Sequence, residues 1–174
     1  MASRDWLRIH MVGSASTAKE SFAARLEAAL KVRKLGSVVL IEDAREAVSE
    51  RLETDREDHH YFFTVENEYM KYETSNSTRG KNLIFVDSLV DRYLDSKKVG
   101  VNLELYFSPR LGAADENFLF LYGPTFTEDR SEVIRRFQLP VHVWNTLDET
   151  AVEAAVEAAS LRLRNIQHGK RKKR

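Results

Sequence analysis

The sequence contains no cysteine, which excludes a disulfide framework, a thiol nucleophile and a cysteine-ligated zinc site. It has no apolar run near the roughly 18 residues that a membrane-spanning helix needs, so we expect no membrane partner. Its first residues, MASRDWLRIH, do not resemble a signal peptide. Proline-, glycine- or serine-rich linkers and fixed-period repeats are also missing. Together these absences predict a single globular domain with a cytoplasmic location.

Net charge is also lacking, because 27 basic residues balance 27 acidic ones. The charge is unevenly distributed, since residues 170–174 read KRKKR and the rest of the chain is therefore mildly acidic. We predict one domain over residues 1–168 and a basic, disordered tail over 169–174. Such a tail could add weak, salt-dependent contact with nucleic acid through residues 170–174.

Apolar runs that alternate with helical patterns predict the fold class. Strands are expected where β-branched and aromatic residues cluster, at 6–12, 37–41, 82–86, 117–123 and 141–145. Helical spacing is found at 17–32, across 44–76 as two helices, at 88–97 and at 149–165. Strands separated by helices predict a three-layer α/β/α sandwich with a five-stranded, mostly parallel sheet.

In such a sheet, ligands bind at the carboxyl ends of the strands. The first strand is followed by GSASTAKES, residues 13–21, in which Gly13 and Lys19 occupy two positions of the phosphate-loop pattern G-x-x-x-x-G-K-[ST]. Ala18 stands at the second glycine position, and Glu20 replaces the hydroxyl that binds Mg²⁺. Ser21 could take over that hydroxyl role. The alternative is a helix cap, with a serine or threonine before a glutamate in the first turn.

The other strand ends carry charged residues. Glu42 and Arg45 follow the second strand, and Asp87 and Ser88 follow the third. The fourth strand leads into GPTFTEDRSEVIRR, which contains three arginines, Arg130, Arg135 and Arg136. Asp87 could instead cap the following helix, and Glu42 with Arg45 could be a surface ion pair.

The ordered set of motifs resembles the nicotinamide riboside kinase-like group of P-loop kinases. In that group E-x-x-R follows the second strand, as Glu42 and Arg45 do here. A hydrophobic strand ends in Asp-Thr, where this chain has Asp87 and Ser88, and an acidic, arginine-bearing lid precedes the last strand. The resemblance extends over residues 8 to about 160.

The resemblance implies ATP and Mg²⁺ as cofactors and a role for each matching position. The phosphates would lie on the loop, whose residues are Gly13, Ser14, Ala15, Ser16, Thr17, Ala18, Lys19 and Ser21. Ser21 and Asp87 would lie near Mg²⁺, while Glu42, Arg45, Ser88 and Arg136 would contact the acceptor. The catalytic set implied is Lys19, Asp87, Arg130 and Arg135. These residue types suffice for phosphoryl transfer, which needs positioning and charge neutralisation.

Three functions therefore remain open. The first is transfer of the ATP γ-phosphate to a nucleoside, nucleotide or nicotinamide riboside-like acceptor. The second is a catalytically impaired pseudokinase that senses nucleotides or binds proteins, which Ala18 and Glu20 favour. The third is a nucleic-acid-associated protein that uses its basic tail.

Overall fold

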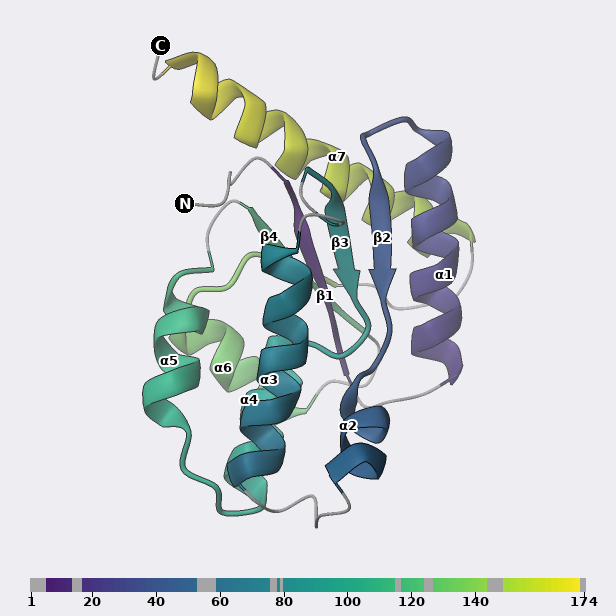
Figure 1. Cartoon of the computed structure of the whole chain (residues 1–174). Coiled ribbons are helices and arrows are strands. Elements are labelled where there is room, and N and C mark those ends of the chain that lie inside the picture. Colours follow the sequence, from purple (N-terminus) through teal and green to yellow (C-terminus); the bar gives the residue numbers. More distant parts are fainter. Residues whose placement is uncertain are drawn as a thin grey trace.

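The computed structural model contains five strands and seven helices in its described part (Figure 1). The residues described are 6–13, 17–52, 59–75, 78, 80–114, 117–123, 127–143 and 149–172. Among them, no helix is both long enough and apolar enough to cross a lipid bilayer.

The strands form one sheet in which every pairing is parallel, in the order β2-β3-β1-β4-β5. Their bounds are β1 Arg8–Val12, β2 Val38–Ile41, β3 Asn82–Phe85, β4 Phe118–Tyr122 and β5 Val141–Val143. The central strands are almost fully buried, which explains why their sequences read as continuous apolar runs. The predicted five-stranded parallel sheet is confirmed, and β2 and β5 form its edges.

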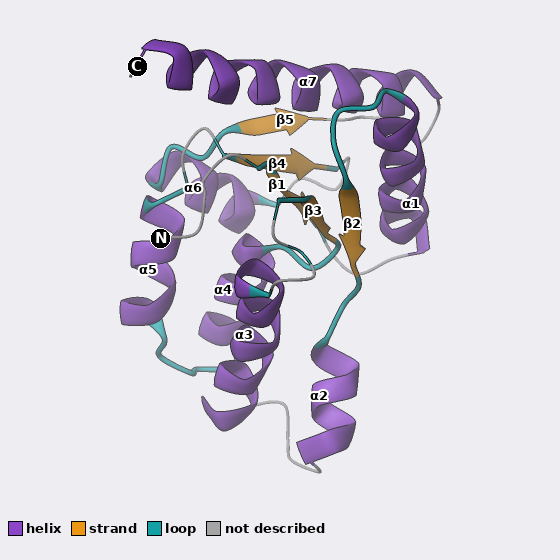
Figure 2. Ribbon diagram, turned by 45° about the horizontal axis from the view of Figure 1, so that its top comes forward, coloured by secondary structure: helices purple, strands orange, loops and turns teal. Residues whose placement is uncertain are grey.

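Helices cover both faces of the sheet, which confirms the three layers (Figure 2). On one face, α1 (Thr17–Val32) and α7 (Glu149–Lys172) pack against Ile9 and Met11 of β1. This layer is mainly aliphatic, and Ala155 and Ala159 of α7 are both fully buried. Small side chains at these positions let the long helix lie close to the sheet.

The opposite face is aromatic. It is covered by five helices, α2 (Arg45–Leu52), α3 (His59–Thr74), α4 (Leu89–Lys98), α5 (Glu104–Gly112) and α6 (Glu128–Arg136). Phe85 and Phe120 of the sheet pack with Tyr69, Tyr93 and Phe107 of these helices. All five side chains are almost completely buried, so this layer holds most of the large rings of the core.

The amino edge of the sheet is fixed by Trp6 and Asn82. The Asn82 side chain accepts a hydrogen bond from the Leu7 N–H at 2.9 Å and donates to the Leu35 carbonyl at 3.2 Å. Gly36 has a φ of +106°, and a Cβ added there would lie 3.2 Å from the Trp6 ring. Glycine is therefore required at Gly36 both by its backbone conformation and by the space beside Trp6.

Three features differ from the sequence-based expectation. Helices α5 and α6 fall in segments where we predicted none. Helix α7 continues past residue 165 to Lys172, so residues 169–172 of the predicted disordered tail are helical. Residues 173 and 174 lie outside the described residues.

Candidate functional site

Charged side chains from four parts of the chain meet at the carboxyl edge of the sheet. Lys19 comes from the first turn of α1, Arg45 begins α2, and Arg130 lies in the first turn of α6. Two carboxylates, Asp87 after β3 and Asp91 in the first turn of α4, lie between these cations. Parallel strands end at one edge, and for this reason segments so distant in sequence converge.

The loop after β1 is anchored by hydrogen bonds to the backbone of its glycine, Gly13. Gly13 has a φ of +144° and donates its N–H to Asp91 Oδ2 at 3.0 Å, while its carbonyl accepts a hydrogen bond from Lys19 Nζ at 2.9 Å. Lys19 is only 6% exposed, so its ammonium group is directed into the protein. The predicted loop residues Ser14, Ala15 and Ser16 lie outside the described residues.

The two altered loop positions are accommodated without backbone strain. Helix α1 begins at Thr17, so Ala18 is helical and does not have the positive φ that would have required glycine. Glu20 is exposed, in keeping with a side chain that turns outward on the helix. Ser21 is exposed as well, and its role near Mg²⁺ stays a prediction.

Asp87 accepts hydrogen bonds from two side chains, Arg45 and Tyr69. Arg45 donates two hydrogen bonds to the Asp87 carboxylate, from Nε to Oδ2 at 2.7 Å and from Nη2 to Oδ1 at 2.8 Å. This forked geometry is the strongest that a carboxylate and a guanidinium can form. The Tyr69 hydroxyl donates to Oδ2 at 3.1 Å and accepts the Ala44 N–H at 3.0 Å, which connects Asp87 to the start of α2. Asp95 also pairs with Arg45.

The predicted pair of Glu42 with Arg45 is not the contact that forms, because Arg45 turns to Asp87 and Asp95. Glu42 is exposed. Helix α4 is capped by Ser88 rather than by Asp87, since the Ser88 hydroxyl accepts the Asp91 N–H at 3.0 Å. Ser88 is fully buried, and it also donates to Asp91 Oδ2 at 2.6 Å.

Asp91 is the site residue that sequence reasoning missed. Its Oδ2 accepts from Gly13 and Ser88 and lies 3.9 Å from Lys19 Nζ, while its Oδ1 accepts from Arg130 Nε at 2.7 Å. One carboxylate therefore binds the loop, the lysine and the arginine at once. The only local signal is the spacing Ser-x-x-Asp at residues 88–91, which is typical of a helix start and gives no hint of these distant partners.

The three arginines of the predicted lid separate in the structure. Tyr122, at the end of β4, exchanges two hydrogen bonds with the Thr127 backbone and so fixes the start of α6, which places Arg130 at Asp91. Arg136 pairs instead with Glu104 at 2.8 Å. Arg135 is exposed.

Burial and charge shift the ionisation of the site. Burial lowers the pKa of Lys19, and the carboxylates of Asp91 and Asp87 oppose that shift. Burial acts to lower the pKa of Arg45 as well, but its ion pair with Asp87 outweighs burial and leaves the pKa raised. Burial and the charge on Asp87 raise the pKa of Tyr69. The tyrosine is therefore a protonated hydrogen-bond donor to Asp87 throughout the neutral range.

A buried ion pair supports the site from behind. Arg92 and Glu66 are 2% and 1% exposed and are joined at 2.5 Å between Nε and Oε1. Arg92 also donates to the main-chain carbonyl of Asp87 at 2.6 Å, and its guanidinium lies 4.0 Å from the centre of the Tyr69 ring. The backbone that carries Asp87 is thus held in place by buried side chains of α3 and α4, on the aromatic face of the sheet.

Lys19, Arg45 and Arg130 would together bind an anion if that anion replaced the carboxylates with which they now pair. Among the described residues, no group of three or more carboxylates or histidines is placed to hold a metal ion. Comparison of the chain with models of protein families, and with curated proteins, finds no match.

Proposed function

We propose that the protein is a P-loop kinase-like enzyme that binds ATP at the carboxyl edge of its sheet. It would transfer the γ-phosphate to a nucleoside, nucleotide or nicotinamide riboside-like acceptor. The observation that carries the proposal is the position of Lys19. It lies in the first turn of α1, buried, with its Nζ 2.9 Å from the Gly13 carbonyl and 3.9 Å from Asp91, which also pairs with Arg130.

In this proposal the phosphates displace contacts that the protein makes to itself. Lys19 would leave the Gly13 carbonyl for the β- and γ-phosphate oxygens, and Arg130 would leave Asp91 to contact the transferred group. The start of α1 adds backbone N–H groups and the positive end of a helix dipole, both of which favour anions. Neutralising phosphate charge in a buried setting is the main task in phosphoryl transfer.

In this proposal Asp87 receives the proton from the acceptor hydroxyl. Arg45 would first break its hydrogen bond to Asp87 Oδ1 and contact the acceptor. The freed Oδ1 would then take the proton. Tyr69 and Arg92 would meanwhile hold the Asp87 side chain and backbone in place. The protein would therefore orient the acceptor between α2 and the end of β3.

The residues present fit Mg²⁺ in one respect. This ion prefers oxygen ligands and usually binds one or two carboxylates together with substrate phosphates and water. As the alternative to accepting the proton, Asp87 would supply such a carboxylate through a bridging water, and Ser21 is the second predicted ligand. When bound, the ion would neutralise charge on the phosphates.

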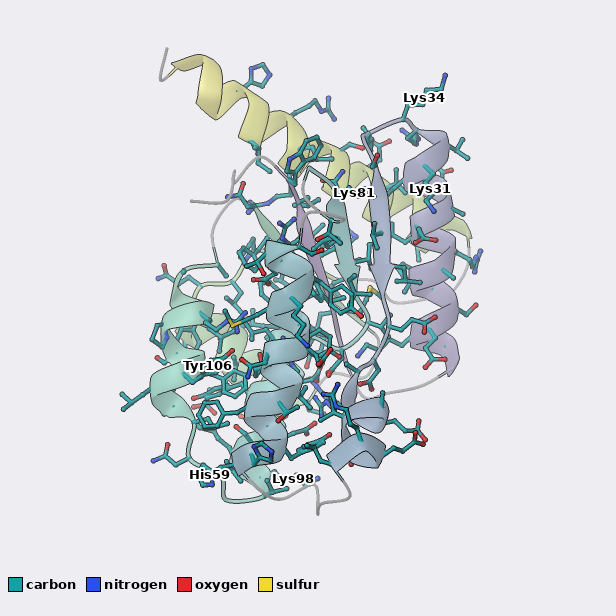
Figure 3. All side chains as sticks on the ribbon, in the orientation of Figure 1. Lys31, Lys34, His59, Lys81, Lys98 and Tyr106 are labelled. Carbon is teal, nitrogen blue, oxygen red and sulfur yellow. The ribbon has the colours of Figure 1, made fainter. Side chains whose placement is uncertain are left out.

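The first test is titration calorimetry with ATP, in the presence and absence of Mg²⁺. We expect micromolar binding that Lys19→Ala abolishes. The matched control is Lys31→Ala, because Lys31 lies in the last turn of the same helix, exposed and far along it from the site (Figure 3). ATP that binds equally well to Lys19→Ala, or fails to bind the native protein, would contradict the proposal.

A second candidate is a nucleotide sensor without turnover. It is favoured by Asp91, which already neutralises both Lys19 and Arg130, and by the carboxylate of Glu20 at the usual hydroxyl position. The two candidates differ in product. Under saturating ATP and a panel of nucleosides, nucleotides and nicotinamide riboside, the kinase forms ADP in step with a phosphorylated acceptor, and the sensor forms neither.

A further inference from the structure

A groove opens at the amino edge of the sheet, at the end of the molecule opposite the carboxyl-edge site. It measures about 550 Å³ and lies between the end of α1 and the first residues of β2 and β3. Three lysines line it, Lys31 in the last turn of α1, Lys34 in the turn after α1, and Lys81 just before β3. Gly36 and Ser37 form part of its wall, and both are exposed. The groove therefore gathers cations from two separate parts of the chain (Figure 3).

The groove is positively charged because its lysines meet few acids. None of the described residues that line it is acidic. In the part of the chain that the structure describes, neither Lys34 nor Lys81 forms an ion pair. Lys31 lies 3.4 Å from Glu27, but its side chain is 55% exposed, and such surface pairs are weak. Most of the charge of the groove is thus available to an anionic partner.

The turn that carries Lys34 is fixed against the segment that carries Lys81. The Trp6 ring lies beside both, since a Cβ added at Gly36 would lie 3.2 Å from it and one added at Gly80 would lie 3.7 Å from it. The backbones of the two lysines are therefore held in place before a partner arrives. Such preorganisation reduces the entropy that is lost on binding.

Lys34 has a backbone conformation that disfavours lysine. Its φ is +52°, in the left-handed region where glycine or asparagine usually follows the end of a helix. A residue with a Cβ costs free energy in this region, so the stability of the turn does not explain the lysine. Residues held in such conformations concentrate at binding sites. Contact with an anion gives the charge of Lys34 a function.

Further cations continue along the same edge. Arg8 begins β1, the neighbour of β3, and its Nη1 donates to the Lys81 carbonyl at 3.3 Å, although the carboxylate of Glu73 offsets part of its charge. The carboxyl-terminal end of α7, which reads KRK at residues 170–172, lies at this end of the molecule, on the side away from β2 (Figure 1). A row of separated cations matches a chain of phosphates better than a single phosphate group.

The edge of β2 is closed to a peptide that would add as a further strand. The Leu40 N–H donates to the Glu27 carboxylate at 2.9 Å, so this outward backbone group is already occupied. Addition of a strand depends on such free main-chain groups. The groove therefore favours a partner that binds through charge rather than through a backbone ladder.

We propose that the amino edge binds the phosphate backbone of single-stranded nucleic acid. Lys31, Lys34 and Lys81 bind phosphate oxygens as point charges, the Ser37 hydroxyl donates to one of them, and residues 170–172 form a second contact. Arginine, asparagine and glutamine, which read base edges, are missing from the described lining of the groove, so binding is independent of sequence. The proposal does not depend on the kinase proposal, because the strand lies at the opposite edge of the sheet.

The test is fluorescence anisotropy with a labelled oligothymidylate of about 20 nucleotides, which is longer than the usual site of a small binding domain. We expect saturable binding to the full-length protein, with an affinity that falls as salt is raised. Lys81→Gln should weaken binding at least about threefold and reduce the steepness of the salt dependence by about 0.7, the value of one phosphate contact. The matched control is Lys98→Gln, because Lys98 is an exposed lysine at the end of α4, at the other end of the molecule (Figure 3). It should leave both quantities unchanged.

Lys34→Gly separates binding from folding. It removes the charge and supplies the residue that the left-handed φ favours, so binding should weaken at least about threefold while the melting temperature does not fall. Arg33→Gln, one residue earlier, removes a cation that already pairs with Glu153 and Glu157 of α7. It should weaken binding less than Lys34→Gly does.

Three outcomes would overturn the proposal. The first is that the native protein does not bind the oligothymidylate at low salt. The second is that Lys34→Gly and Lys81→Gln bind as tightly as Lys98→Gln, which would assign the contact to residues 170–174 alone. The third is that polyglutamate of matched charge competes as well as unlabelled oligothymidylate, which would assign the groove to an acidic peptide.

Discussion

Replacing Arg92 by methionine should strongly destabilise the protein. Methionine keeps most of the side-chain volume but removes the charge that Glu66 meets at 2.5 Å, and Glu66 is 1% exposed. Among the described residues, its remaining ion-pair partner is Arg110 at 3.5 Å. Breaking a buried pair by removing one partner costs about 3–5 kcal/mol, because a buried charge loses its compensation. In a chain of this length the loss lowers the melting temperature by about 6–20 °C.

The assay is urea denaturation followed by circular dichroism, with Glu66→Leu and the double variant measured beside Arg92→Met. The double variant should regain much of the stability, because a paired apolar replacement leaves no buried charge. Arg51→Met is the matched control, since Arg51 forms an exposed pair with Glu68 at 3.1 Å and should lose less than about 1 kcal/mol. The reasoning fails if Arg92→Met costs no more than this control, or if the double variant is less stable than either single one.

Three further predictions concern the site, pH and the amino edge. Asp91→Asn removes the anion that competes for Lys19 and Arg130, so ATP should bind at least about fivefold more tightly; weaker binding in calorimetry would mean that Asp91 orients the cations instead. Burial and nearby arginines hold the pKa of His10 well below 6.5, so the unfolded chain binds a proton below that pH and the folded one does not. Stability should fall below pH 6.5 by up to about 1.4 kcal/mol per pH unit, and a His10→Phe variant with the same slope in urea titrations would disprove this. Gly36→Ala should cost about 1–2 kcal/mol in the same assay because of its φ of +106°, and a neutral result would contradict the strain argument.

The sheet was predictable from sequence because its strands are buried on both faces. Burial on both faces selects continuous apolar runs, and such runs are visible in NLIF of β3 and FLFLY of β4 without any knowledge of partners. Helix α5 was missed for a local reason. It is only 9 residues long and carries Pro109 inside it and Gly112 at its end, so its pattern is weak.

Four of the charged residues that meet at the carboxyl edge were expected there from the sequence, but Asp91 and the pairings were not. Lys19, Arg45, Asp87 and Arg130 follow or flank strand ends, where a parallel sheet gathers polar groups. Which acid meets which base depends on the order of the strands, and no local pattern encodes that order. Arg45 reaches Asp87 because β2 lies beside β3, with Ile41 opposite Phe85. Asp91 has partners 78 and 39 residues away, so only the folded chain reveals its role.

The central place of β1 in the sheet has a consequence for how the chain folds during synthesis. Arg8 pairs with Leu83 on one side and with Phe118 on the other, so β1 is synthesised before both of its neighbours and cannot complete its pairing until residue 118 has emerged. Contacts this distant in sequence slow folding, since the entropy of loop closure is lost before the contacts form. Until then β1 has no neighbouring strands to pair with, and the apolar face of α1 has no sheet to pack against. The nascent chain should therefore depend on chaperones until β4 is made, and fragments that end before Phe118 should aggregate.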